Sequence, residues 1–310
     1  MLRKTVRWTP LFAVVLLPKY DPLKFDDYIR KYHPNQVLSI PAYWEVMTKI
    51  NKIERVDMSC FKHLYAGGEK MDPETEERIN KLIKQCGSKT QLYNCMGSTE
   101  MTAGATIIYD NCYVPGSAGI PMIGINCKIV DPDTTDEVYY NSEGEICFSG
   151  PTLMLGYYNN HEATDDIVKI HQDGIRWLHT GDLGYIDEDG HIFVTGRIKR
   201  IVMTKGRDGQ VTKLFPDRIE RVISSCDSVE QCCVIGVPDE MRIHYPKAFV
   251  ILKNNMDTER ARKEITDSCI QNLPEYMVPE EIELVDDLPR TSRGKIDYRA
   301  LELEMENIKS

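Results

Sequence analysis

Five short stretches of this 310-residue chain combine glycine with hydroxyl or charged side chains, in patterns that could carry chemistry. They are residues 65–69 (YAGGE), 94–100 (NCMGSTE), 178–185 (LHTGDLGY), 195–199 (TGRIK) and 290–297 (RTSRGKID). The first four include or follow the end of a predicted strand. Because the ends of strands are where open α/β sheets bind their ligands, these stretches are the first candidates for a binding site.

The side chains in these stretches suit a ligand that carries phosphate. Thr99 offers a hydroxyl to a phosphate oxygen, and Glu100 offers the hard carboxylate oxygen that Mg²⁺ prefers. Asp182 suits the two hydroxyls of a ribose, as acidic residues do in dinucleotide sites. Arg197 could bridge ribose and phosphate oxygens with two hydrogen bonds. Lys295 could stabilise negative charge that develops on phosphorus or on a carboxylate.

Each stretch also has an ordinary structural interpretation. Residues 65–69 could be a plain turn, and Ser98 or Thr99 could cap the helix that follows. Asp182 could be a β-turn aspartate, Arg197 a surface arginine on a hairpin, and Lys295 a solvated loop lysine. Taken singly, the signals leave both interpretations open; their order and spacing together favour the functional one.

Predicted strands and helices alternate between residues 11 and 95. Apolar runs of strand length lie at 11–17, 36–40, 63–66 and 91–95. Between them, Asp21-Pro22 and Asp72-Pro73 each supply an N-cap followed by a proline at the first helical position. Gly87 is a predicted C-cap. This βαβα series predicts a parallel sheet wrapped by helices.

Two changes of pattern further along predict more subdomains. From about residue 114, short strands at 126–130, 137–140, 145–149, 176–179 and 191–195 indicate a small antiparallel or barrel-like subdomain. After residue 198, a hairpin across Asp208-Gly209 precedes the helices and strands of a compact α+β domain. The predicted fold class is therefore α/β, with a partial parallel-sheet subdomain at 1–113, a β-rich subdomain at 114–198 and a C-terminal α+β domain at 199–310.

The composition bears on the partners of the protein and on its location in the cell. The net charge of −10 makes nucleic acid or an anionic membrane an unfavourable general partner. The longest apolar run, 11–17, is too short to span a bilayer, and no small-residue cleavage site follows it. Ten cysteines occur without any CxxC pair, a pattern typical of a reducing compartment. We therefore expect a cytoplasmic protein without a membrane span.

The ordered set of motifs resembles the adenylate-forming superfamily, which comprises acyl-CoA synthetases, the adenylation domains of peptide synthetases, and luciferases. The resemblance runs from about residue 11 to about residue 301. Besides the five stretches above, it rests on residues 144–150 (GEICFSG) with 156–158 (GYY), and on 215–220 (FPDRIE). With 178–185 and 195–199 counted as the two ends of one motif, these are six motifs in order, and together they make the resemblance highly specific.

The resemblance implies a two-step reaction, in which ATP and a small-molecule carboxylic acid give an acyl-adenylate and pyrophosphate, and the acyl group then passes to a thiol. The implied acceptor is coenzyme A, or alternatively the thiol of a carrier protein. The implied nucleotide contacts are Gly68, Glu69, Asn94, Met96, Gly97, Thr99, Asp182 and Arg197, with Glu100 binding Mg²⁺ and Lys295 as the catalytic residue. Lys199 falls at the hinge about which the C-terminal domain would rotate, and Gly206 would approach the channel of the thiol.

Several positions depart from the family pattern. Met96 replaces the usual aromatic residue that stacks on adenine, and a methionine packs more softly. Residues 207–214 are longer than the usual turn, and Arg218 replaces a glutamate, although Glu220 remains. The family's phosphate-binding loop has no counterpart upstream of residue 11.

From that missing loop we expect a truncated chain with uncertain activity of its own. An unpaired parallel sheet also makes homo-oligomerisation a prospect. The alternative interpretations are a peptide-synthetase adenylation domain and a non-catalytic nucleotide-binding fragment. The motifs do not identify the acid.

Overall fold

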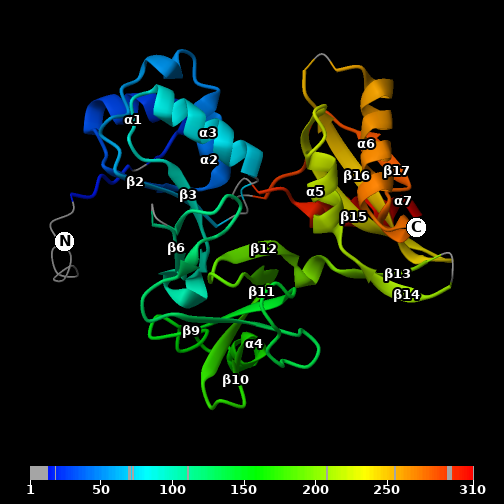
Figure 1. Cartoon of the computed structure of the whole chain (residues 1–310). Helices are drawn as coiled ribbons and strands as arrows, with labels where there is room; N and C mark the ends of the chain where they lie inside the picture. Colours follow the sequence, from blue (N-terminus) through cyan, green and yellow to red (C-terminus); the bar gives the residue numbers. More distant parts are fainter. Residues whose placement is uncertain are drawn as a thin grey trace. The chain divides into compact units, whose positions relative to one another are not determined.

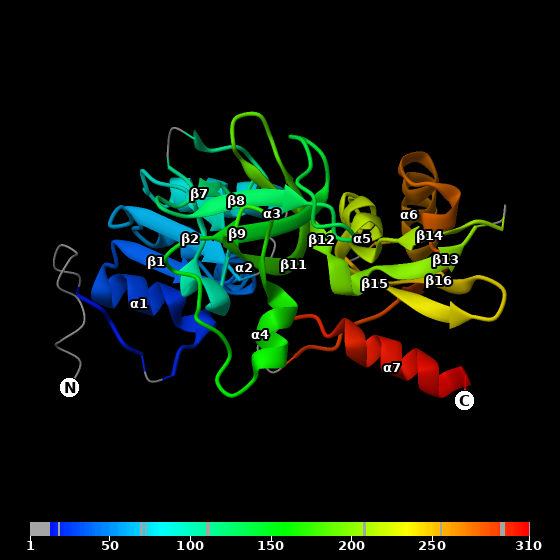
Figure 2. The same ribbon diagram turned by 90° about the horizontal axis from the view of Figure 1, so that it is seen from below.

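The computed structural model describes residues 13–17, 19–68, 71, 73–109, 112–206, 209–254, 256–291 and 295–309. The chain divides into two compact units (Figures 1 and 2). The first unit comprises residues 1–97 and 106–119, and the second comprises 98–105 and 120–310. The predicted boundaries at 113 and 198 stay predictions.

The first unit contains a parallel sheet with three strands, in the order β1–β2–β3. The strands are β1 (Gln36–Ser39), β2 (His63–Gly67) and β3 (Leu92–Cys95), and the helices are η1 (Pro22–Lys24), α1 (Phe25–Tyr32), α2 (Pro41–Thr48), η2 (Ile53–Arg55) and α3 (Pro73–Gln85). The Asp21 side chain accepts a hydrogen bond from the backbone N–H of Leu23, as the predicted N-cap requires. Trp44, Leu64 and Ile79 join helices and sheet in one buried core. The predicted βαβα series is confirmed for these elements.

The predicted strand at residues 11–17 is wrong for the part that the structure describes. Residues 13–17 have no strand conformation, and Val14 and Leu16 are largely exposed. A strand needs a neighbour for its backbone hydrogen bonds, and the described sheet pairs only β1, β2 and β3. An apolar run without a neighbouring strand does not form a strand here.

The second unit begins with an antiparallel sheet of five strands, in the order β10–β11–β9–β8, with β12 paired to β11. The strands are β8 (Asn126–Val130), β9 (Gly144–Ser149), β10 (Val168–Ile170), β11 (Arg176–Ile186) and β12 (Ile192–Arg197), with helix α4 (His161–Ile167) before β10. The predicted antiparallel subdomain is confirmed. The predicted strand at 137–140 is wrong, because only Glu137 forms an isolated bridge, to Val130, and Tyr139 and Tyr140 are exposed with no layer to pack against.

The remainder of the second unit is an α+β structure around a three-stranded sheet, ordered β15–β16–β17. Its elements are η5 (Ile198–Arg200), β13 (Val202–Lys205), β14 (Val211–Leu214), α5 (Pro216–Ser224), β15 (Val229–Asp239), β16 (Ile243–Leu252), α6 (Thr258–Asn272), η6 (Glu275–Met277), β17 (Glu281–Leu284) and α7 (Tyr298–Lys309). β13 and β14 pair as the predicted hairpin, although Asp208 lies outside the described residues.

Alternation along β15 explains why both faces of this sheet are covered. Cys232 and Val234 pack with α5 and α6 in one core, whereas Cys233 and Ile235 pack with α7 in another. Successive side chains of a strand point to opposite faces, so one continuous apolar run supplies both cores. The mixed α/β fold class is confirmed.

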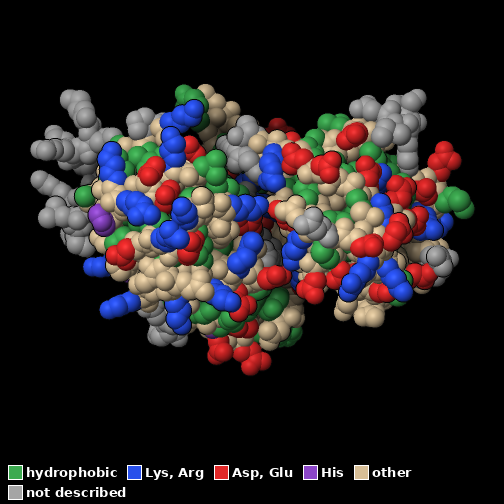
Figure 3. Space-filling view, turned by 90° about the horizontal axis from the view of Figure 1, so that it is seen from above, with side chains coloured by type: hydrophobic (Ala, Val, Ile, Leu, Met, Phe, Trp, Pro, Cys, Tyr) green, Lys and Arg blue, Asp and Glu red, His purple; other side chains and the backbone are tan. Residues whose placement is uncertain are grey.

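Short elements connect these layers. They are β4 (Gly97–Ser98), η3 (Thr99–Met101), β5 (Ala103–Gly104), β6 (Thr106–Ile107) and β7 (Ile120–Pro121). Among the described residues, every helix is too short or too polar to cross a bilayer. Acidic and basic side chains are interspersed on the face drawn in Figure 3.

Candidate functional site

A bulge in β11 presents Asp182. The pairing of β11 with β9 shifts between His179, opposite Cys147, and Leu183, opposite Glu145. Three residues of β11, 180–182, therefore face a single residue of β9, and Gly181 adopts a positive φ of 70°. Such bulges are common next to functional sites, because they redirect side chains.

Asp182 is paired with Arg197, the residue opposite it on β12. Its Oδ1 lies 2.7 Å from Arg197 Nε, and the aspartate side chain is 15% exposed whereas the arginine is 57% exposed. Burial raises the pKa of Asp182 to about 6; Asp217 and Glu145 also raise it, and Arg197 and Lys295 lower it. Burial therefore disfavours the ionised form of Asp182, while the guanidinium beside it is largely solvated. A perturbed carboxyl of this kind is a candidate for accepting hydrogen bonds from a ligand.

Lys295 lies within electrostatic range of Asp182, because its charge lowers the pKa of that carboxyl. The backbone of the lysine is fixed by its loop: Thr291 donates its N–H to the Lys295 carbonyl at 2.7 Å, and Thr291 Oγ1 accepts from the Lys295 N–H at 3.2 Å. The second unit thus pairs Asp182 with Arg197, and the charge of Lys295 acts on the same carboxyl.

Glu100 joins the same electrostatic neighbourhood, since the charge of Arg197 helps to lower its pKa. Its Oε1 accepts a hydrogen bond from the Tyr157 hydroxyl at 2.6 Å. Burial alone would raise the pKa of Glu100, but the hydrogen bonds and the charge of Arg197 outweigh burial and place it below its ordinary value. The carboxylate is therefore ionised and keeps oxygen lone pairs for a cation.

Thr99 begins the short helix η3 and is exposed. The residue before it, Ser98, caps this helix by accepting a hydrogen bond from the Met101 N–H. The structural interpretation of the stretch is thus correct for Ser98. It leaves the Thr99 hydroxyl on the surface, where a phosphate could reach it.

The first unit places the remaining predicted residues at the carboxyl ends of two neighbouring strands. Asn94 on β3 lies opposite Ala66 on β2, and Gly68 follows β2 with a φ of 82°. Asn94 is buried, and its Oδ1 has no hydrogen-bond partner among the residues that the structure describes. A buried amide oxygen without a partner is costly, so this atom is a ready acceptor for a ligand N–H.

The neighbours of Asn94 are less informative. Met96 is half-buried, and its backbone N–H and carbonyl both bond to Thr106. Gly97 is exposed, and Glu69 lies outside the described residues. The roles of all these residues stay predictions.

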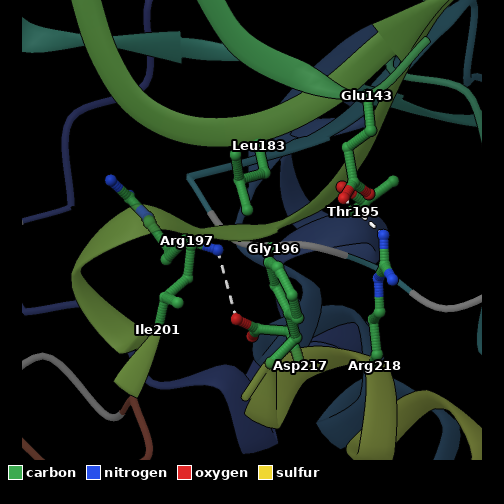
Figure 4. A pocket seen from close by; sticks show the side chains of 9 residues that line it. Glu143, Leu183, Thr195, Gly196, Arg197, Ile201, Asp217 and Arg218 are labelled. Carbon is green, nitrogen blue, oxygen red and sulfur yellow. Dashed lines mark hydrogen bonds and ion pairs between the residues drawn. The ribbon is translucent and has the colours of Figure 1, made fainter. Parts of the chain in front are cut away.

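The predicted hinge residue, Lys199, is exposed in η5, next to a buried ion-pair network. Arg200 binds Asp217 and Glu220 at 2.7 Å each. Asp217 also accepts a hydrogen bond from the backbone N–H of Arg197 at 3.1 Å, which Figure 4 shows together with the pair between Arg218 and Glu143. The cavity among these residues measures only about 10 Å³, so this junction is packed rather than open to a ligand.

Gly206, the predicted thiol-channel residue, follows β13. Its N–H donates to the Gln210 carbonyl at 2.9 Å, and it lines a groove of about 770 Å³. The groove lies between β13, β16 and the segment around η6, with Lys205, Arg242, Tyr245 and Tyr276 among its lining residues.

In the structure, three residues that no sequence motif singled out contact the predicted site residues or the chain next to them. Tyr157 bonds Glu100, Asp217 holds the Arg197 backbone, and Glu145 bonds the bulge before Asp182. Tyr157 and Glu145 stand in motifs that were recognised, but their partners are distant in sequence. Only the fold could reveal their roles.

With this geometry in hand, comparisons with known proteins define the class as adenylate-forming. The model for the AMP-binding enzyme matches residues 8–158, and the model for the C-terminal domain of AMP-binding enzymes matches residues 218–295. The chain belongs to the AMP-binding enzyme family.

Its relatives include two curated CoA ligases. Probable 4-coumarate–CoA ligase 1 of Dictyostelium discoideum is 30% identical over 91% of this chain and 49% of its own length. The long-chain-fatty-acid–CoA ligase of Bacillus subtilis is 31% identical over 96% of this chain and 50% of its own length. The chain therefore spans about half the length of these relatives.

A solved structure agrees. ATP-bound MatB from Rhodopseudomonas palustris superimposes with a TM-score of 0.80 and 25% identity, over 95% of this chain and 55% of that one.

Proposed function

We propose that this chain activates a carboxylic acid with ATP, as an acyl-adenylate, and transfers the acyl group to coenzyme A. The observation that carries the proposal is the cluster in the second unit. There, Asp182 is ion-paired with Arg197 and lies within the field of Lys295, and Arg197 in turn acts on Glu100. These four groups come from four of the five stretches, and their mutual electrostatic influence supports an ATP site.

Asp182 is proposed to accept the ribose hydroxyls, and binding would compensate for the burial that now raises its pKa. Arg197, largely exposed, is free to turn from Asp182 toward ribose or phosphate oxygens. Lys295 is proposed to stabilise the negative charge that grows as the carboxylate attacks the α-phosphorus. Thr99 would donate its hydroxyl to that phosphate.

The residues present fit a Mg²⁺ ion carried by the nucleotide. Mg²⁺ is commonly held by one or two carboxylates together with substrate phosphates, and Glu100 supplies one ionised carboxylate. Tyr157 orients that carboxylate by donating a hydrogen bond to its Oε1. When bound, the ion would neutralise phosphate charge.

In the first unit, we propose that Asn94, Gly68, Met96 and Gly97 contact adenine. The Oδ1 of Asn94 lacks a partner among the described residues and would accept from the exocyclic amino group. The positive φ of Gly68 brings bare backbone to the strand end, where a flat ring can lie against it.

The groove beside Gly206 supports a thiol acceptor of the size and charge of coenzyme A. Its lining combines the cations Lys205 and Arg242 with the aromatic rings of Tyr245 and Tyr276, and it also includes the acids Glu275 and Glu280. Such a lining suits a ligand that has both phosphates and an adenine ring. Arg242 is ion-paired with Glu280, which lines the same groove.

The test is ATP–pyrophosphate exchange with a panel of carboxylic acids, on the wild-type chain and on Lys295→Ala. We expect exchange to fall by about 10²–10³-fold in Lys295→Ala, the scale for removing a group that stabilises transition-state charge. Lys263→Ala, on the exposed face of α6, is the matched control and should exchange like the wild type. A folded wild-type chain that binds ATP but exchanges with none of the acids would contradict the proposal for this polypeptide.

A further inference from the structure

The bulge in β11 leaves backbone groups that the neighbouring strand β9 does not pair. Residues 180–182 lie opposite Ile146 alone, so the ladder with β9 is interrupted between His179 and Leu183. Unpaired buried backbone groups cost free energy, and a persistent bulge must satisfy them with side chains.

Two side chains satisfy this bulge. The Thr180 hydroxyl donates to the Ile146 carbonyl at 2.7 Å and accepts from the Asp182 N–H at 3.1 Å. The Gly181 N–H donates to Glu145 Oε1 at 2.9 Å. Glu145 lies on β9, and its side chain is only 9% exposed.

We propose that Glu145 is a positioning residue that fixes the bulge and thereby aims Asp182 at the nucleotide. This inference rests on the proposed function of Asp182. The buried carboxylate acts through the backbone of Gly181 and touches no reacting group. Its hydrogen bond holds the left-handed glycine from which the next residue, Asp182, projects.

The second oxygen of Glu145 is anchored by a chain of two histidines. Glu145 Oε2 lies 2.7 Å from His179 Nδ1, and His179 Nε2 lies 2.9 Å from His171 Nε2. A carboxylate oxygen accepts, so His179 donates from Nδ1, and a neutral His179 then accepts at Nε2 from His171. Burial and the nearby charge of Lys128 lower the pKa of His171, which favours its neutral form. The chain of hydrogen bonds thus runs in one direction, from half-buried His171 to Glu145.

Donor atoms of Glu145, Cys147 and His179 lie within 4.8 Å of one another, close enough to suggest a metal site. The hydrogen bonds argue against it, because both carboxylate oxygens and both nitrogens of His179 already have protein partners. Burial also raises the pKa of the Cys147 thiol, which therefore stays protonated. The cluster is a support for the bulge.

The charge of Glu145 offers a way to distinguish a positioning role of this residue from a general packing role. Burial and the charges of Asp217 and Glu145 raise the pKa of Asp182, whereas the charges of Arg197 and Lys295 lower it. Glu145→Gln keeps an oxygen acceptor for the Gly181 N–H but removes this charge. Its amide N–H₂ would then donate to His179 Nδ1, and both histidines would have to exchange tautomers.

The experiment compares Glu145→Gln and Glu145→Ala with the exposed control Glu137→Gln. Three quantities are measured: the His179 tautomer by ¹⁵N NMR, the Asp182 carboxyl pKa by ¹³C NMR, and amide exchange at Gly181. We expect Glu145→Gln to move the His179 proton to Nε2, to lower the pKa of Asp182 and to keep Gly181 protected. We expect Glu145→Ala to speed exchange at Gly181 by about tenfold or more, the scale for losing a hydrogen bond to a charged group.

Kinetics supply the functional arm. Glu145→Ala should raise the KM for ATP by about tenfold or more with a small change in kcat, and Glu145→Gln should restore most of that loss at pH 8. Unchanged Gly181 exchange in a folded Glu145→Ala variant would overturn the proposal, as would an unchanged His179 tautomer in Glu145→Gln. The NMR measurements need no catalysis, so they test Glu145 even if the wild-type chain shows no exchange activity. A Glu145→Gln variant in which the KM for ATP rises and kcat falls together would also count against a positioning role.

Discussion

The ionised Asp182 carboxylate should lower the stability of the ligand-free protein, although it is proposed to bind the ribose. The variant Asp182→Asn measures this loss as a change in the free energy of unfolding. The pKa of Asp182 is raised from an ordinary 3.8 to about 6, chiefly by burial. Each pKa unit corresponds to about 1.36 kcal/mol between the two protonation states, so a shift of about two units costs about 3 kcal/mol once the group is ionised. Asparagine resembles the neutral acid and does not carry this cost.

The sign of the effect fixes its pH window. A raised pKa means that the folded chain holds the Asp182 proton more tightly than the unfolded chain does. The resulting contribution to stability is fully present below about pH 3.8 and is lost as the pH rises through about 6. We therefore expect Asp182→Asn to match the wild type at pH 3.5 and to exceed it by about 3 kcal/mol at pH 7.5.

Urea unfolding followed by tryptophan fluorescence is suited to this test, because Trp177 is buried on β11, the same strand as Asp182. Asp165→Asn, on the exposed part of α4, is the matched control and should shift stability by less than about 0.5 kcal/mol. Equal stability of Asp182→Asn and wild type at pH 7.5 would refute the reasoning. An equal gain at both pH values would refute it too, since burial of a charge would then not be the cause. Whatever the stability result, Asp182→Asn should lower the affinity for ATP if Asp182 binds the ribose.

Three further predictions follow from the same contacts. Arg200→Met should lower the free energy of unfolding by about 3–5 kcal/mol in urea titrations, because it leaves the mostly buried Glu220 without its charge partner; a loss below about 1 kcal/mol would contradict this. Glu100→Gln should raise the Mg²⁺ concentration for half-maximal exchange by about tenfold, and Tyr157→Phe by less, whereas an unchanged Mg²⁺ requirement would remove Glu100 from the metal site. Lys199→Pro should spare pyrophosphate exchange and slow thioester formation, and equal loss of both steps would count against a hinge.

The parallel sheet of the first unit was predictable because its signals are local. Pro41 begins α2, and the left-handed Gly87 follows α3 closely, as caps and prolines indicate. The apolar run at 11–17 had the same composition as a buried strand, yet residues 13–17 have no strand partner. Whether an apolar run becomes a strand depends on a neighbour, and a neighbour is not a local property.

The candidate site divides in the same way. The positions of Asp182, Arg197 and Lys295 were predicted from motif order, since each motif is short and contiguous. What the sequence could not supply is the pairing of Asp182 with Arg197 at 2.7 Å, or the effect of the Lys295 charge on the pKa of Asp182. Those depend on β-sheet register and on a loop about a hundred residues away.

The bulge shows why supporting residues are harder to predict than the residues they support. Glu145 reaches Gly181 across 36 positions of sequence, and only because the register between β9 and β11 slips by two residues at that point. A regular ladder would have paired the Gly181 backbone directly and left the glutamate without a purpose in the interior. The slip creates both the unpaired N–H and the space for the carboxylate, so the position of Asp182 and the burial of Glu145 are consequences of one irregularity. Removing Glu145 should therefore disturb Asp182 more than its neighbours on the regular part of β11, where the ladder itself holds the backbone.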